Sequence, residues 1–291
     1  MNTDWSRQVQ GIDTLYLSRK NRFHDCFGAQ YKALFRLDEG KSLRILEIGC
    51  GPGALLEALR RWYPEADLTG LDRDSAFIAF ARERLNGVRL LEGDAAQLPF
   101  EDGCFDVCIS NTVSEHIEPT AFFGEQQRVL KRGGVCLVLS ARKGLKATAP
   151  CLEENAFERV FWEKAAGLDD SFEKYAVCRY PLNEAQLPAM MEKHGFEDIA
   201  SGYVITDFTP DDEKYARDFA RDMIVSEYRA QLESLAYAQR DMERHFDKED
   251  FLRMRRRIDE KYGLRLDLFE RGEKQWDTQV SITQIVRGRK R

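Results

Sequence analysis

A glycine-rich loop follows a carboxylate, an arrangement that could bind a charged ligand through the backbone. Glu47 lies near the end of an apolar run over residues 43–48. The loop that follows it contains Gly49, Cys50, Gly51 and Gly53. Glycines let the chain turn tightly and let its backbone approach a ligand without an intervening side chain. Dinucleotide-binding loops share this spacing, so the glycines alone leave the ligand open.

Carboxylates near this loop narrow the choice of ligand. Asp72 closes a predicted strand over residues 68–71 and could accept hydrogen bonds from both hydroxyls of a ribose. A pyrophosphate would be repelled by Glu47, whereas a cationic sulfonium and an amino group would be attracted to it. Glu47 therefore favours S-adenosylmethionine over NAD as the ligand.

Strands and helices alternate through the segment that must position these residues. Strands are predicted over residues 43–48, 68–71, 88–91, 105–110 and 135–140, and helices over 54–63, 75–85 and 122–130. This alternation indicates an α/β protein with a doubly wound parallel sheet and helices on both faces. Right-handed crossovers then place the loops after the strands along one edge, where such sheets bind ligands.

The second half of the chain is expected to be mostly helical between two further strands. The strands are predicted over residues 196–208 and 279–286. A cap followed by proline at residues 209–210 is typical of a helix start, and the apolar spacing predicts a helix to about Arg244. A second helix is expected to follow Asp247 and to stop at Gly263.

Several motifs in order make the segment over residues 41–142 similar to a known family. The matching segments are residues 47–53, 70–72, 93–95, 98–100, 105–106 and 128–134. They resemble the class I S-adenosylmethionine-dependent methyltransferases, in the small-molecule subgroup related to the ubiquinone-biosynthesis enzymes. The resemblance implies a seven-stranded, mostly parallel sheet whose last strand is antiparallel, with a helical insertion before that strand.

The resemblance also implies a cofactor site built from particular residues. Glu47 would lie near the amino group of S-adenosylmethionine, and Asp72 would bind its ribose. Asp94 would accept a hydrogen bond from the adenine amino group, while the backbone N–H of Ala95 would meet a ring nitrogen. The glycines of the loop would pack against the methionine part. Their neighbours Cys50 and Arg73 belong to the same expected site.

Other residues are candidates for the reacting end of the site and its cover. Asn111 would lie near the transferable methyl group. His116 could be a general base, although a role in shaping the loop is the alternative. Either Tyr16 or Phe23 is expected to lie over the cofactor. The dispersed histidines and cysteines suggest no metal site.

The whole chain, residues 1–291, is expected to form one Rossmann-like domain. Its parts are a helical cover over residues 1–40, the cofactor-binding core over 41–142, a variable substrate-side segment over 143–182 and the helical insertion over 209–274. The insertion could be a substrate lid or a contact in a homodimer. None of the variable segments carries a motif that identifies the substrate.

Composition limits the partners of the chain. The formal net charge of −6 argues against general nucleic-acid binding, because phosphate contacts need clustered Lys and Arg. Seven cysteines without a C-x-x-C pair suggest a reducing cytoplasm. No apolar run is long enough to predict a membrane span.

These features predict an enzyme that transfers a methyl group by in-line displacement to a small-molecule acceptor. Three alternatives remain at this stage. They are an NAD-dependent oxidoreductase, a non-catalytic protein that binds S-adenosylmethionine, and an RNA methyltransferase.

Overall fold

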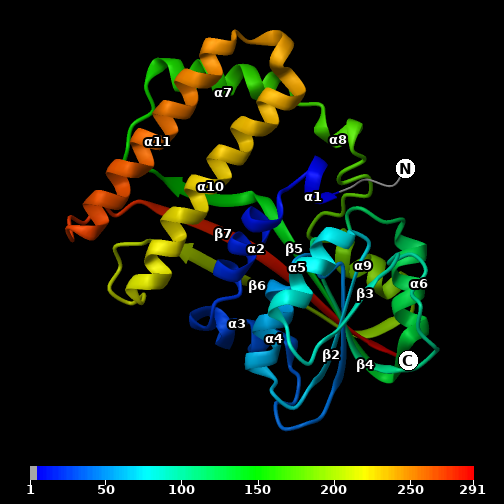
Figure 1. The fold of residues 1–291 in the computed structure, drawn as a ribbon. Helices are drawn as coiled ribbons and strands as arrows, with labels where there is room; N and C mark the ends of the chain where they lie inside the picture. Colours follow the sequence, from blue (N-terminus) through cyan, green and yellow to red (C-terminus); the bar gives the residue numbers. More distant parts are fainter. Residues whose placement is uncertain (1–4) are drawn as a thin grey trace. The chain divides into compact units, whose positions relative to one another are not determined.

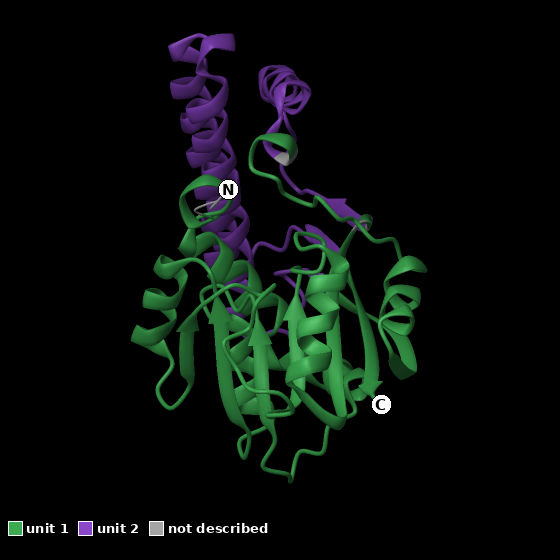
Figure 2. Cartoon of the chain, turned by 90° about the vertical axis from the view of Figure 1, so that its right-hand side faces the viewer, with its two compact units in different colours: residues 1–145, 172–206, 281–291 green, residues 146–171, 207–280 purple. Residues whose placement is uncertain are grey.

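The computed structural model describes residues 5–291, and the chain divides into two compact units, coloured separately in Figure 2. Unit 1 runs to residue 145 and also contains residues 172–206 and 281–291. Unit 2 contains residues 146–171 and 207–280. The expected insertion over 209–274 therefore lies in unit 2, and the expected variable segment over 143–182 is divided between the units. The first four residues of the expected N-terminal cover lie outside the described residues.

A seven-stranded sheet with the order β3-β2-β1-β4-β5-β7-β6 is the centre of unit 1 (Figure 1). Its strands are β1 (Arg44–Ile48), β2 (Asp67–Asp72), β3 (Arg89–Glu92), β4 (Phe105–Asn111), β5 (Leu130–Ala149), β6 (Phe196–Phe208) and β7 (Thr278–Lys290). β1 pairs in parallel with β2 and with β4, β2 with β3, and β4 with β5. This order confirms the predicted α/β class.

The last two strands run antiparallel. Gly288, late in β7, lies beside Phe196 and Ile199, early in β6. Thr206, late in β6, has its Oγ1 atom 2.7 Å from Oγ of Ser281, early in β7. Early residues of one strand thus meet late residues of the other, as expected for the last strand of a mostly parallel sheet.

Helices cover both faces of this sheet, with α4 and α5 on one side and α6 and α9 on the other (Figure 1). The helices of unit 1 are α1 (Trp5–Gln8), α2 (Ile12–Arg22), α3 (Asp25–Phe35), α4 (Ala54–Trp62), α5 (Ser75–Arg84), α6 (Pro119–Val129) and α9 (Gln186–Lys193), and α8 (Ser171–Lys174) lies where the units divide. Leu46 and Ile48 share a core cluster with Phe122 of α6 and Met191 of α9. Because side chains alternate across a strand, Glu47 faces the opposite side, toward α4.

Unit 2 is built around three helices: α7 (Ala156–Leu168), α10 (Arg217–Met242) and α11 (Lys248–Glu270), with a short 3-10 helix (Glu243–His245) between the last two. Its core consists of Phe161, Ala165, Leu235, Ala238, Met242, Phe251, Met254 and Ile258. These residues form apolar stripes at helical spacing, which explains why the helices pack together. No helix in the part of the chain that the structure describes is long and apolar enough to cross a membrane.

The predicted helix start at residues 209–210 is wrong, because α10 begins later along the chain. The side chains that resembled a cap bind elsewhere. Oγ1 of Thr209 is 2.7 Å from Oγ1 of Thr278. The carboxylate of Asp211 accepts hydrogen bonds from the backbone N–H groups of residues 275–276. Tertiary partners therefore replaced the local capping bonds that the sequence pattern suggested.

The predicted stop of the following helix is also wrong, although its start is confirmed. Asp247 caps α11 with a reciprocal pair of side-chain bonds to Asp250. The helix then passes through Gly263 and ends at Glu270, shortly before Gly272 at φ +74°. A glycine inside a helix costs only about 1 kcal/mol relative to alanine, less than the buried contacts on both sides of it supply.

Candidate active site

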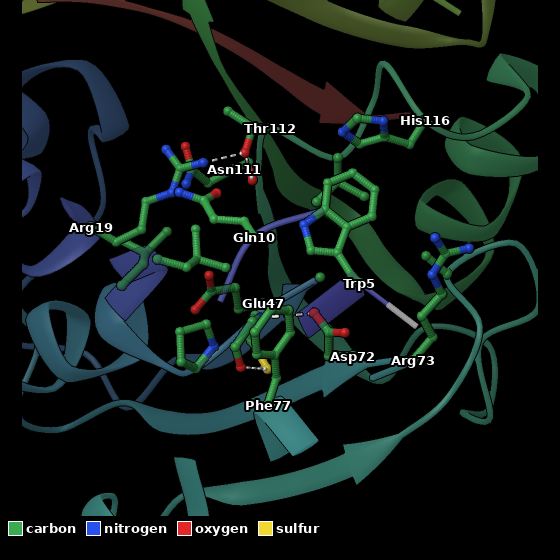
Figure 3. Close-up of a pocket in the computed structure, with 18 of the residues that line it drawn as sticks. Trp5, Gln10, Arg19, Glu47, Asp72, Arg73, Phe77, Asn111, Thr112 and His116 are labelled. Carbon is green, nitrogen blue, oxygen red and sulfur yellow. Dashed lines mark hydrogen bonds between the residues drawn. The ribbon is translucent and has the colours of Figure 1, made fainter. Parts of the chain in front are cut away.

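A cavity of about 460 Å³ opens at the edge of the sheet in unit 1, and Figure 3 shows its lining. The carboxyl ends of β1, β2 and β4 meet there, because parallel strands place their following loops at one edge. The cavity brings together the predicted segments 47–51, 72–73 and 94–95, together with Asn111 and His116.

Glu47 is a buried carboxyl without a full set of partners. Its side chain is 2% exposed, and its Oε2 atom has no hydrogen-bond partner among the described residues. Burial raises the pKa of Glu47 well above its ordinary value, and the nearby Asp72 raises it further while Arg19 opposes both. A cationic ligand placed in the cavity would satisfy this group.

The glycine loop lies against the cavity in a conformation that side chains rarely adopt. Gly49 has φ +67° and Gly51 has φ +52°. A Cβ atom added to Gly49 would lie 2.4 Å from Cγ2 of Val113, so both the backbone angle and the space require glycine. Burial, with Glu47 and Asp72 nearby, raises the pKa of the Cys50 thiol well above its ordinary value, which argues against a nucleophilic thiolate.

Asp72 supports this loop from the end of β2. Its Oδ2 atom accepts a hydrogen bond from the Gly51 N–H at 2.8 Å, and its Oδ1 atom accepts one from the Asp74 N–H at 2.9 Å. Burial raises the pKa of Asp72. The guanidinium of the adjacent Arg73 lies 5.9 Å from the centroid of the Trp5 ring. Asp72 thus both orders the loop and lines the cavity.

The third predicted carboxylate lies at the exposed rim of the cavity. Oδ1 of Asp94 accepts a hydrogen bond from the Ala96 N–H at 2.9 Å. Its neighbour Ala95 is buried and also lines the cavity. One face of a ligand at this rim could therefore meet a carboxylate and an apolar surface together.

Asn111 ends β4 and points an amide into the cavity. It is 8% exposed, and its Oδ1 atom has no partner among the described residues. The next residue, Thr112, has φ +55°, an unusual angle for a residue other than glycine. Its Oγ1 atom accepts a hydrogen bond from Nη2 of Arg19 at 2.8 Å (Figure 3). A bond from α2 therefore helps to hold this loop in place.

His116 lies in the cavity, but one ring nitrogen is already engaged. Its Nδ1 atom accepts a hydrogen bond from the backbone N–H of Cys178 at 3.0 Å. The ring also makes an edge contact with Trp5, with centroids 4.7 Å apart (Figure 3). A neutral imidazole that accepts at one nitrogen carries its proton on the other. In that state His116 has no free lone pair with which to remove a proton from the substrate that receives the methyl group.

Two residues from the expected site do not line the cavity. The hydroxyl of Tyr16 donates to Oε2 of Glu57 at 2.7 Å, which holds its ring between α4 and α5, beside Phe80. Gly53 faces α5, where an added Cβ would lie 2.7 Å from Cδ1 of Leu85. Phe23, the other aromatic residue proposed as a cover, does line the cavity and is 1% exposed.

Sequence reasoning missed five charged or aromatic residues of the lining: Trp5, Arg19, Arg22, Phe77 and Glu115. Burial raises the pKa of Glu115, although Arg19 and Arg142 partly oppose this. Arg19 and Arg22 are one helical turn apart, a spacing that places them on one helix face but does not show whether that face meets solvent or a cavity. Glu115 directly precedes His116, and the sequence analysis proposed only the histidine as a general base at this position.

Comparison with known proteins gives an independent view of the same segment. A family model described as a methyltransferase domain matches residues 46–138. A demethylmenaquinone methyltransferase of Thermus thermophilus is 33% identical over 163 residues, which covers 53% of this chain and 74% of that protein. A fatty-acid O-methyltransferase of Mycolicibacterium smegmatis is 44% identical over 108 residues. Those residues are 36% of this chain, and the match spans 38% of the relative's own length.

A solved structure shows the same fold. The phosphoethanolamine N-methyltransferase 2 of Haemonchus contortus, in complex with S-adenosyl-L-methionine, superposes with a TM-score of 0.52 at 17% identity. The superposition covers 100% of this chain and 60% of that chain. The sheet order, the glycine loop and the extended match to the demethylmenaquinone enzyme agree with the resemblance seen in the sequence. The chain therefore belongs to the class I family of S-adenosylmethionine-dependent methyltransferases.

Proposed function

We propose that this protein transfers a methyl group from S-adenosylmethionine to a small-molecule acceptor. The observation that carries the proposal is Glu47, a buried carboxyl with an unpartnered oxygen beside a loop whose first position, Gly49, has room only for glycine. An unpartnered buried acceptor destabilises the free protein, so a cationic ligand that pairs with it gains affinity there. The ammonium group of S-adenosylmethionine meets that requirement.

The remaining lining supports the same ligand. Asp72, Asp94 and Ala95 all line this cavity, which supports the proposal that Asp72 accepts from the ribose hydroxyls and that Asp94 and Ala95 meet the adenine ring. When bound, the cofactor supplies a methyl group activated by its sulfonium. The protein's part is to align the acceptor in line with that methyl group and to exclude water, which in well-aligned systems lowers a barrier by roughly 7–11 kcal/mol.

NAD fits this cavity less well. A pyrophosphate at the glycine loop would lie beside Glu47. In its ionised form this carboxylate repels phosphate and has no O–H group to donate to it. Asp72 adds a second carboxyl close to the same loop. An NAD-dependent oxidoreductase would therefore have to bind an anionic pyrophosphate beside the carboxyl groups of Glu47 and Asp72.

If the acceptor must lose a proton, Glu115 is better suited than His116 to remove it. Its carboxyl lines the cavity in the same loop, and its raised pKa makes it a stronger base than an ordinary glutamate. Oε2 of Glu115 accepts a hydrogen bond from the Ser114 hydroxyl at 3.3 Å, which leaves further acceptor capacity on the carboxylate.

The acceptor is proposed to be a small, largely apolar molecule in the cytoplasm. Two relatives bear the names of a fatty-acid and a demethylmenaquinone methyltransferase, and Trp5, Phe23 and Phe77 give the cavity an aromatic lining. Cys50, Cys104, Cys108, Cys136 and Cys151 are free thiols, which supports a reducing compartment.

Turnover with a panel of acceptors tests this proposal. The purified protein is incubated with S-adenosylmethionine and fatty acids, quinols or catechols, and adenosylhomocysteine is measured. We expect acceptor-dependent formation of adenosylhomocysteine by the wild type and its loss in Asp72→Ala, with folding checked by thermal denaturation. Formation of a methylated product without adenosylhomocysteine would contradict the proposal.

A further inference from the structure

A short segment of unit 1 contributes to the wall of the cavity without belonging to a helix or a strand. We call residues 176–180 the strap; they lie between α8 and α9. Val177 and Cys178 of the strap line the cavity. None of the residues proposed to bind the cofactor belongs to it, so the cofactor site alone does not explain why the strap lies there.

The strap is bound to the loop that follows β4 through two of its backbone N–H groups. The N–H of Cys178 donates to Nδ1 of His116 at 3.0 Å, and the N–H of Tyr180 donates to the carbonyl oxygen of Glu115 at 2.9 Å. Two residues further on, the carbonyl oxygen of Leu182 accepts a hydrogen bond from Nη1 of Arg142 in β5 at 2.8 Å. These bonds hold the strap against the carboxyl end of β4 and the chain after it against β5.

The backbone of the strap has a conformation that needs such support. Ala176 has φ +53° and Cys178 has φ +52°, angles that are uncommon for residues other than glycine. Backbone of this kind persists only where surrounding contacts hold it. The bond from Tyr180 to Glu115 joins two backbone groups and does not depend on a side chain. The support at Cys178 itself comes from the imidazole of His116, so a single side chain holds the strained residue.

The sheet order indicates which part of a bound substrate the strap would meet. β2 and β3 lie on one side of β1, and β4 and β5 lie on the other. The carboxylates proposed to hold the cofactor, Glu47, Asp72 and Asp94, lie in or directly after β1, β2 and β3. The strap is bound on the β4 side, beside the candidate base Glu115. An acceptor that fills the cavity next to the cofactor would therefore contact the strap, where Val177 offers an apolar surface.

We propose that His116 is a positioning residue: through the Cys178 N–H it holds the strap as the wall of the cavity that contacts the methyl acceptor. This role rests on the proposed function, since it concerns the acceptor end of the same site. The imidazole also packs edge-on against Trp5 of α1, with the ring centroids 4.7 Å apart (Figure 3). That contact restricts rotation of the ring and keeps Nδ1 directed toward the strap.

Three substitutions of His116 separate its hydrogen bond from the bulk of its ring. In His116→Asn the amide oxygen takes the place of Nδ1, because both atoms are bonded to Cγ. His116→Leu keeps apolar bulk but has no acceptor. His116→Gln is polar, but its amide lies one bond further from Cα and does not replace Nδ1. The matched control is His245→Leu, which removes an exposed histidine of unit 2.

Hydrogen exchange at the strap measures the bond without any ligand, in the full-length proteins. We expect the amides of Cys178 and Tyr180 to exchange about tenfold faster in His116→Leu and His116→Gln, in line with the loss of one hydrogen bond. His116→Asn and His245→Leu should stay within about twofold of wild type, because the bond is retained. Equal exchange in every protein, or no rescue by His116→Asn, would overturn the role of His116. Thermal denaturation checks folding, and if His116→Leu does not fold, the difference between His116→Gln and His116→Asn decides.

Binding and kinetics then show which ligand the strap serves. Calorimetry with adenosylhomocysteine should give affinities within about threefold of wild type for all variants, because the strap lies outside the proposed cofactor contacts. With an acceptor from the turnover panel, His116→Leu should raise the acceptor KM about tenfold and lower kcat no more than about threefold, and His116→Asn should restore KM.

A loss of adenosylhomocysteine affinity in His116→Leu that His116→Asn also shows would assign the ring to the cofactor and overturn the positioning role. A lower kcat with an unchanged acceptor KM would overturn it as well. Wild type that binds no adenosylhomocysteine would overturn the proposed function, whereas normal wild-type binding with unchanged exchange in the variants overturns the role of His116 alone.

Discussion

Buried charge is handled differently in the two units. In unit 2, Arg265 is 2% exposed and donates through Nε and Nη2 to Asp277 and Asp211, leaving only its Nη1 atom without a partner in the described chain. In the cavity of unit 1, Glu47 and Arg22 are buried with atoms that nothing in the described chain satisfies.

This difference distinguishes buried charged groups that stabilise the fold, such as Arg265, from buried groups that a ligand could pair with, such as Arg22 and Glu47. Two carboxylates surround Arg265, and they raise its pKa despite its burial. The pKa of Arg22 is lowered and that of Glu47 is raised, so in each case the charged form is disfavoured in the free protein. A buried group whose charged form is disfavoured in this way is stabilised when a ligand of opposite charge binds beside it.

The largest expected effect comes from breaking the satisfied cluster. Asp211→Asn should destabilise the protein by about 3–5 kcal/mol, because removing one partner leaves buried charge uncompensated. Chemical denaturation measures this loss. The control is Glu213→Gln, whose exposed pair with Lys274 should leave the denaturation midpoint unchanged. A loss for Asp211→Asn as small as that of the control would remove the distinction between the two units.

The next largest effect is expected on the catalytic rate, when Glu115 is replaced. If this carboxylate accepts a proton during transfer, Glu115→Gln should lower kcat about a hundredfold, equivalent to about 2.7 kcal/mol. His116→Gln should cost only a few-fold. Because burial raises the pKa of Glu115, the wild-type rate should fall as the pH drops through a midpoint above its ordinary value. This acid limb should vanish in Glu115→Gln, and its persistence there would exclude Glu115 as the base.

A smaller effect with opposite signs for binding and stability is expected at Glu47. Glu47→Gln should weaken binding of S-adenosylmethionine about tenfold, because the ammonium group loses an anionic partner. The same change should stabilise the free protein by about 1 kcal/mol, since it removes a buried ionisable group without a partner.

The pH dependence of that stabilisation has a definite sign. A carboxyl whose pKa is raised on folding destabilises the folded state as the pH rises above the pKa of the unfolded chain. The advantage of Glu47→Gln over wild type should therefore be absent at low pH and grow as pH increases. Thermal denaturation across a pH series measures it. An advantage that shrinks toward neutral pH would contradict the account.

The smallest effect is expected at the exposed rim. Asp94→Ala should weaken binding of adenosylhomocysteine by only about fivefold, because a hydrogen bond in contact with water contributes about 1 kcal/mol. Titration calorimetry resolves a change of this size. A loss larger than that of Glu47→Gln would show that adenine recognition, and not the charged tail, dominates affinity.

The sheet and the glycine loop were predictable from the sequence because their signals are local. Apolar runs ended by Gly49 or Asp72 define both a strand and the loop that follows it. The helix boundaries near residues 209–210 and Gly263 were not predictable. Distant side chains satisfied the apparent cap in one case, and packing on both sides carried the helix through the glycine in the other.

Arg19 and Arg22 of the N-terminal helical cover were missed for a related reason, since their role also depends on tertiary packing. Nothing in the local pattern around Arg19 and Arg22 distinguishes arginines on a solvated helix face from arginines that face a cavity. Tyr16 was predicted as a cover residue on the same local grounds, but its hydroxyl donates to Glu57 and its side chain does not line the cavity. Only the packing of α2 against the sheet edge decides which residues meet the ligand.

Proton release on binding tests the central claim most directly. Wild type and Glu47→Gln are titrated with S-adenosylmethionine and with NADH across a pH series, in buffers of different ionisation enthalpy. Because burial raises the pKa of Glu47, wild type should bind S-adenosylmethionine but not NADH and should release a proton in part of that series, as Glu47 ionises on binding. Glu47→Gln should bind S-adenosylmethionine more weakly and without that release. Binding of NADH in place of S-adenosylmethionine, or equal proton release in both proteins, would contradict it.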